Sequence, residues 1–144
     1  MLLVSPNFDS NGAIPSDYTC DGSDTSPELR WFEAPEGTKS FALSCIDPDS
    51  PGGNFVHWLI YGIGADVTTI DAGEIPDGTI ELENDFGNPG YGGPCPGTGT
   101  HRYFFSLYAL DTDNLGEVSP DNFLEKIEEA TLEKAVLMGT YERI

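Results

Sequence analysis

Runs of apolar residues divide the chain into short segments separated by turns. The readable strands cover residues 40–46, 55–63, 102–110 and 136–142. The segments 55–63 and 102–110 are apolar on both faces, which is typical of central strands that are covered on two sides. Glycine and proline, with 17 and 11 residues, punctuate the chain and favour strands and long turns over helices. The pattern therefore predicts a mainly β protein.

One segment carries the signals of a helix. Ser119 can cap a helix, Pro120 suits the first helical position, and Asp121 falls in the first turn. The apolar residues that follow at helical spacing form a core-facing stripe: Phe123, Leu124, Ile127 and Ala130. We expect this helix to end before the last strand.

The composition is that of one folded domain spanning residues 1–144, since apolar residues make up 38% of the chain and no linker or repeat interrupts it. The longest apolar runs are far too short to cross a bilayer, so we expect no integral membrane association. The N-terminal residues lack the basic and long apolar regions of a signal peptide, and the simplest expectation is a cytoplasmic protein.

Charge is the strongest compositional signal. The chain has 25 acidic against 6 basic residues and a formal net charge of −19. Such a surface repels nucleic acid and anionic lipid, so neither is an expected partner. At about 1 M salt the screening length falls to roughly 3 Å and this self-repulsion largely vanishes. We therefore interpret the chain as a halophile's protein, with an ordinary acidic protein as the alternative.

Three cysteines, an odd number without a C-x-x-C pair, indicate neither a disulfide framework nor a zinc ribbon. Cys45 lies in an apolar strand and is expected to be a buried, small hydrophobic residue. Cys20 and Cys95 each lie in a glycine-rich turn, and the sequence leaves open whether they form a bridge.

Two turn-flanked segments carry candidate chemistry. Residues 47–53 read Asp-Pro-Asp-Ser-Pro-Gly-Gly, a tight turn after a strand. We expect Asp49 to form the turn and Asp47 to have a different role. Downstream, strand alternation places His57 on one face with Leu59 and Tyr61, and Trp58 on the other.

The second segment is the glycine-rich loop 90–99, which leads into the strand that contains His101. Five glycines in ten residues let a backbone approach a ligand and aim N–H groups at it. The loop lacks a phosphate-loop motif and precedes a strand, so it is not a nucleotide-binding loop. Alternation places His101 and Tyr103 on one face, while Arg102 points away and is expected to pair with a carboxylate.

Imidazoles, a phenol and loop N–H groups are hydrogen-bond donors that together suit a phosphate-like anion. Asp47 adds a negative charge, but it can orient a histidine or accept a proton from a hydrogen-bonded phosphate. We therefore expect one pocket for a small anion built from Asp47, His57 and His101, without a metal or a cofactor.

These residues fall in segments that resemble a known family, the phosphatidylethanolamine-binding proteins, and most closely their bacterial and archaeal branch, often labelled Raf-kinase-inhibitor-like. The resemblance spans nearly the whole chain. The segments that carry it are Ile14-Pro15, Tyr18–Gly22, Ser26–Leu29, Asp47–Pro51, His57-Trp58, Asn84–Gly87, Gly90–Pro96, His101–Asp111 and Gly139–Arg143.

The resemblance implies a β-sandwich of two sheets with one or two short helices and a small anion pocket at one end. Carried over to this sequence, the pocket residues are Asp47, His57, Gly93, Pro94, His101 and Tyr103, with Ser50, Pro51 and Phe55 on the rim. Phosphate, carboxylates and phosphorylated head groups are the ligands that the resemblance implies. It leaves pairing as a homodimer open.

The leading hypothesis is a binding module for a small phosphorylated or carboxylated ligand, and not an enzyme. One alternative, implied by the resemblance, is an inhibitor of a kinase or a serine protease. Another is a hydrolase that uses Asp47, His57 and His101 for acid–base chemistry, although the chain has no motif of a committed nucleophile. A metal site formed by these three residues and Asp49 matches no known ligand spacing.

Overall fold

The computed structural model describes residues 1–143 of the chain. This part contains eight strands and two short helices, joined by loops. The strands are β1 (Leu2–Val4), β2 (Leu29–Phe32), β3 (Ser40–Asp47), β4 (Phe55–Gly64), β5 (Thr69–Ile70), β6 (Ile80–Glu81), β7 (Thr100–Leu110) and β8 (Thr131–Glu142). The helices are the 3-10 helix η1 (Ser16–Tyr18) and the α-helix α1 (Phe123–Ala130).

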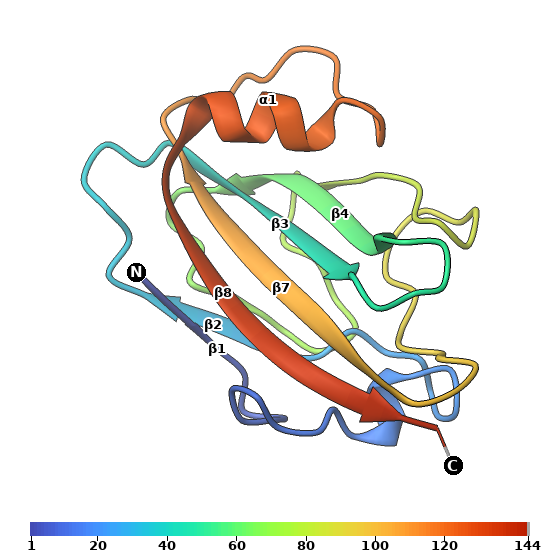
Figure 1. Ribbon diagram of the computed structural model, residues 1–144. Helices are drawn as coiled ribbons and strands as arrows, with labels where there is room; N and C mark the ends of the chain where they lie inside the picture. Colours follow the sequence, from blue (N-terminus) through green and yellow to red (C-terminus); the bar gives the residue numbers. More distant parts are fainter. Residues whose placement is uncertain (144) are drawn as a thin grey trace.

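The strands form two antiparallel sheets. The small sheet has the order β1-β2-β5, and the large sheet has the order β6-β4-β3-β7-β8. Figure 1 shows the long strands of the large sheet side by side, with β1 and β2 behind them and α1 across one end. The predicted class, a mainly β protein with two sheets and one or two short helices, is confirmed.

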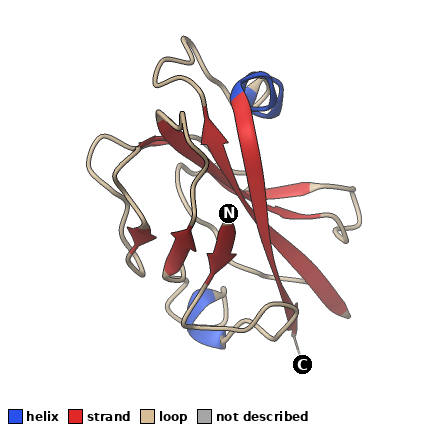
Figure 2. Ribbon diagram, turned by 90° about the vertical axis from the view of Figure 1, so that its left-hand side faces the viewer, coloured by secondary structure: helices blue, strands red, loops and turns tan. Residues whose placement is uncertain are grey.

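Each face of the large sheet has its own apolar cluster. Between the sheets, Trp31 on β2 packs with Phe41, Trp58 and Phe105 of the large sheet. Full burial of such side chains contributes roughly 1.5–3 kcal/mol each. On the opposite face, Phe123 and other residues of α1 cover a second cluster. Figure 2 shows β8 running from this helix to the C-terminal end. No helix within residues 1–143 is long and apolar enough to cross a membrane.

The helix prediction is partly wrong. Ser119 does not begin the helix, because residues 119–122 form a turn in which the Asn122 N–H donates to the Ser119 carbonyl at 3.2 Å. The helix starts only at Phe123, and β8 follows it directly at Thr131. Leu124 is 40% exposed and does not join the core-facing stripe.

A bulge in β4 changes the predicted alternation. Cys45 pairs with Trp58 and Ile46 pairs with Val56, so His57 is the extra residue on β4. A bulge re-aims the side chains next to it. Trp58 therefore lies in the inner core, on the same side as His57, and the prediction that these two residues face opposite ways is wrong. The bulge also exchanges the expected faces of the following residues, Leu59, Ile60 and Tyr61.

Candidate functional site

A cavity of about 110 Å³ opens where three strands of the large sheet meet a loop. Antiparallel pairing brings the end of β3 beside the start of β4 and the start of β7. The lining residues are Asp47, Ser50, Pro51, Phe55, His57, Phe86, Cys95, Pro96, Gly97, His101 and Tyr103. This is small beside the roughly 300–1,000 Å³ of typical ligand pockets, so the cavity suits a small group.

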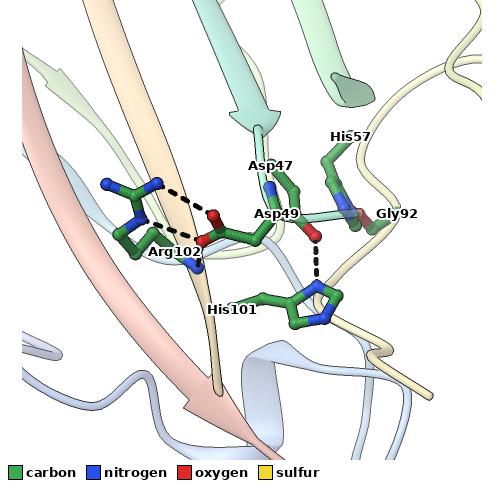
Figure 3. A network of polar contacts seen from close by, with 6 residues as sticks. All are labelled: Asp47, Asp49, His57, Gly92, His101 and Arg102. Atoms are coloured by element: carbon green, nitrogen blue, oxygen red, sulfur yellow. Dashed lines mark hydrogen bonds and ion pairs between the residues drawn. The ribbon is translucent and has the colours of Figure 1, made fainter. Parts of the chain in front are cut away.

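Asp47 is the buried carboxylate of the cavity. Its side chain accepts two hydrogen bonds, Oδ1 from the Asp49 N–H at 2.7 Å and Oδ2 from His101 Nδ1 at 2.7 Å. The first of these bonds shapes the turn after β3, so the expectation that Asp47 has no turn-forming role is wrong. The second orients the His101 ring, and Figure 3 shows the two side chains facing each other.

His57 makes hydrogen bonds with Gly92 through both its side chain and its backbone. Its Nδ1 donates to the Gly92 carbonyl at 2.6 Å, and its own carbonyl accepts the Gly92 N–H at 3.0 Å. Because a carbonyl only accepts, Nδ1 carries the proton, and Nε2 is the free nitrogen of the neutral ring. Burial is the main cause that lowers the pKa of His57 below its usual value of 6.5, so the ring favours the neutral form.

Tyr103 lines the cavity from β7. The residue is fully buried, and its hydroxyl oxygen has no hydrogen-bond partner among residues 1–143. Burial, and then the negative charge of Asp47, raise the pKa of Tyr103 well above its usual value, so the phenol stays protonated. A buried hydroxyl without a partner costs about 1–3 kcal/mol, and an acceptor from a bound molecule would remove that cost.

Arg102 lies between His101 and Tyr103 in sequence but turns to the other side of β7, as Figure 3 shows. Its guanidinium donates to both carboxylate oxygens of Asp49, at 2.8 and 2.9 Å, and its backbone N–H donates to the same side chain. These hydrogen bonds lower the pKa of Asp49 to about 2. The prediction that Arg102 pairs with a carboxylate is confirmed.

Gly93 and Pro94 lie outside the set of described residues that line the cavity. The Gly93 N–H donates to Asp24 Oδ1 at 2.8 Å, and the Pro94 carbonyl accepts the Cys20 N–H at 3.1 Å. A Cβ on Gly93 would lie 2.9 Å from Thr19 Cα, closer than real Cβ contacts. The expectation that the N–H groups of this loop face a ligand therefore fails at Gly93, because its N–H donates to Asp24 in the segment before β2.

The loop is also tied covalently. Cys20 and Cys95 form a disulfide with a Cα–Cα distance of 5.4 Å, while Cys45 is buried and free, as predicted. Disulfides are uncommon in the reducing compartments of mesophiles, so this bridge does not favour the predicted cytoplasmic location. That location stays a prediction.

Sequence reasoning missed four lining residues: Phe86, Cys95, Pro96 and Gly97. Phe86 is 46% exposed, and its ring contacts both Phe55 and His57 edge-on. The run of prolines and glycines marks the segment of the other three as an unusual loop, but a local pattern does not say which way their side chains point.

The described residues contain no group of three or more metal-ligating side chains. Asp49, one member of the conceivable metal set, faces Arg102 on the other side of β7. The cavity instead combines a hydroxyl donor, two imidazoles and one carboxylate acceptor.

Comparison with known proteins identifies the family. The family model described as phosphatidylethanolamine-binding protein matches residues 4–142. The chain belongs to this family. A UPF0098 protein of Methanothermobacter thermautotrophicus is 47% identical, with 99% of each chain covered. A UPF0098 protein of Aquifex aeolicus is 42% identical, covering 99% of this chain and 89% of that protein.

Two solved structures of phosphatidylethanolamine-binding protein relatives share the whole fold. The Escherichia coli protein YbcL, described as a new member of the mammalian family, superposes with a TM-score of 0.93 at 30% identity, covering 99% of this chain and 98% of that chain. The homologue CT736 of Chlamydia trachomatis gives 0.92 at 34% identity, covering 99% and 97%. The resemblance inferred from the sequence is therefore confirmed.

Proposed function

We propose that this phosphatidylethanolamine-binding protein family member binds a small oxyanion of the phosphate or carboxylate class in the cavity lined by Asp47, His57, His101 and Tyr103. The observation that carries the proposal is the buried Tyr103 hydroxyl, which lacks a partner among the described residues. A phenol held protonated donates readily to an anionic oxygen, and hydrogen bonds to charged groups contribute about 1.5–3 kcal/mol.

The two histidines support the same role in different ways. His101 Nδ1 is engaged by Asp47, which leaves Nε2 available to a ligand when the ring is protonated. His57 is fixed by Gly92 and surrounded by the rings of Phe55, Phe86 and Tyr103. The cavity is thus shaped before a ligand arrives, and preorganisation reduces the cost of binding.

The test compares Tyr103→Phe with Tyr61→Phe, which removes the same hydroxyl on the helix-covered face of the large sheet. Binding of inorganic phosphate and of acetate is measured by calorimetry, with thermal unfolding as a check of the fold. We expect Tyr103→Phe to weaken binding by about tenfold or more and Tyr61→Phe to leave it unchanged. Equal affinity in both variants would refute the proposed site.

A hydrolase is the second candidate, because the Asp47–His101 pair resembles the orienting pair of acid–base catalysts. We propose binding without turnover, since no hydrogen bond among the described residues joins the Ser50 hydroxyl to His101 as a nucleophile would require. A panel of chromogenic esters and phosphates tests this. Turnover that disappears in His57→Ala would favour the enzyme. An inhibitor role towards a kinase or protease rests on family membership alone.

We further infer that the protein works at high ionic strength. The net charge of −19 is spread along the chain, and all three arginines already pair with carboxylates. Salt screens the remaining repulsion. The melting temperature is expected to rise between 0.1 and 3 M KCl, and a melting temperature that falls would contradict the inference.

A further inference from the structure

We propose that, among phosphate-type oxyanions, the cavity selects those that carry one negative charge and an ionisable proton, such as the monoanion of a phosphate monoester, and rejects dianions. This specificity rests on the proposed function, because it concerns which anions enter the same cavity. It follows from the charges and hydrogen-bond acceptors that line the cavity.

Few charged groups line the cavity. Among the described residues that line the cavity there is one carboxylate, Asp47, and neither a lysine nor an arginine. Within this described lining, positive charge can come only from the rings of His57 and His101, and His57 is buried beside three aromatic rings. Even with His101 protonated, its charge only cancels that of Asp47, so the lining has no net positive charge and a ligand with two negative charges is disfavoured more than a ligand with one.

The nearest guanidinium groups are already neutralised. Arg102 is held by both oxygens of Asp49 on the outer side of β7. Arg143 pairs with Asp21 at 3.0 Å, and its contact with the loop is to Cys95 Sγ at 3.7 Å. A further carboxylate acts on the same region, since Asp24 lies behind the loop at the Gly93 N–H. The surroundings therefore disfavour a dianion further.

Asp47 also presents a hydrogen-bond acceptor. Both of its oxygens accept a hydrogen bond from the protein, as an ionised carboxylate does. A carboxylate has about four acceptor positions, so it can accept one more hydrogen. An ionised ligand oxygen placed there would be repelled. A P–OH group placed there would instead donate a short, charge-assisted hydrogen bond.

The ligand would then face hydrogen-bond donors at one end and a hydrogen-bond acceptor at the other. Its ionised oxygens accept from Tyr103 and from a protonated His101, while its hydroxyl donates to Asp47. A monoanion with one proton satisfies all three groups, and sulfate, which has no proton at neutral pH, leaves Asp47 facing a negative oxygen.

Three probes separate proton and charge. Methyl phosphate is a proton-bearing monoanion at pH 5 and a dianion at pH 8, since its second pKa is about 6. Dimethyl phosphate is a monoanion without a proton at both pH values, and sulfate is a dianion at both. Affinities are measured by calorimetry at constant ionic strength. Because dimethyl phosphate experiences the same protein titration, the ratio of methyl phosphate to dimethyl phosphate affinity reports on the ligand alone.

We expect this ratio to fall at least tenfold from pH 5 to pH 8, and sulfate to bind at least tenfold more weakly than methyl phosphate at pH 5. A ratio that does not change with pH, or sulfate that binds as well as methyl phosphate at pH 5, would overturn the specificity while leaving anion binding intact. Failure of all three probes to bind would refute the proposed function and this inference together.

The variant Asp47→Asn tests the acceptor directly. It removes the negative charge and adds an amide donor, so sulfate affinity relative to methyl phosphate at pH 5 is expected to rise at least tenfold. Asp49→Asn makes the same chemical change two residues away, outside the cavity lining, and should leave this preference unchanged. Thermal unfolding confirms that both variants fold. An unaltered sulfate preference in folded Asp47→Asn would contradict the role of Asp47.

Discussion

The two walls of the cavity are built by different means. The strand wall, formed by Asp47, His57, His101 and Tyr103, carries the polar chemistry on β3, β4 and β7. The loop wall, formed by Cys95, Pro96 and Gly97, carries no charged side chain and is tied by a disulfide, and the preceding Gly93 packs closely against the segment before β2. The sheet therefore positions the polar side chains of the cavity, while the loop closes its other side.

The largest expected effect comes from removing the disulfide of the loop wall. Replacing both Cys20 and Cys95 with serine is expected to lower the free energy of unfolding by about 2–4 kcal/mol, because the bridge closes a chain segment of 75 residues. Chemical unfolding in high salt measures the change. A reductant should destabilise the wild-type protein by a similar amount and have no effect on the double variant. A wild-type protein indifferent to reductant would show that the bridge does not hold the loop.

Two glycines of the same loop are expected to differ in how much stability an added Cβ costs. A Cβ at Gly93 would press against Asp24 and Thr19, whereas a Cβ at Gly97 meets nothing within 4 Å. Gly93→Ala is therefore expected to cost about 1–3 kcal/mol of stability, and Gly97→Ala less than about 0.5 kcal/mol. Equal effects in denaturant unfolding would mean that the loop is not packed as described.

On the strand wall, His57 should give stability a pH dependence. Its pKa is lowered in the folded state, mainly by burial, so the unfolded chain binds more protons below about pH 6.5. The free energy of unfolding should fall as pH drops from 6.5 and level off below the folded pKa, with a slope of at most about 1.4 kcal/mol per pH unit.

The control for this prediction is His57→Gln, which lacks the titrating ring. The difference between the wild-type and variant stability curves isolates His57, and a flat difference between pH 4.5 and 7.5 would contradict its burial.

The smallest effect is expected beside the strand wall. Arg102 and His101 are neighbours on β7, yet only His101 lines the cavity. Arg102→Gln should change phosphate affinity by less than about twofold, since it removes one exposed ion pair, whereas His101→Gln should weaken binding at least tenfold. Calorimetry on both variants decides. A larger loss in Arg102→Gln would place the anion on the wrong side of β7.

The strand wall could be predicted from the sequence because alternation along β7 is regular. It separates Tyr103 from Arg102 correctly, and the apolar runs of β3, β4 and β7 are long enough to recognise. Alternation fails at Trp58, since a bulge depends on pairing between strands and leaves no mark in a local pattern. The short strands of the small sheet carry two to four residues each, too few for a periodic signal.

The loop wall could not be predicted in the same way. The glycines of residues 90–99 suggested a backbone aimed at a ligand. Instead, the Gly92 N–H donates a hydrogen bond to the His57 carbonyl, and the Gly93 N–H donates one to Asp24. Glycine permits close approach without specifying to what. The partners of this loop, including Asp24 for the Gly93 N–H and Cys20 for Cys95, lie far from it in the sequence and leave no mark in a local pattern.

The most direct test of the account is a crystal structure determined with phosphate present. We predict an anion in the cavity with one oxygen within hydrogen-bond distance of Tyr103 Oη and another facing the Asp47 carboxylate. A cavity closed by side chains, or an anion bound only at the Arg102 side of β7, would contradict it.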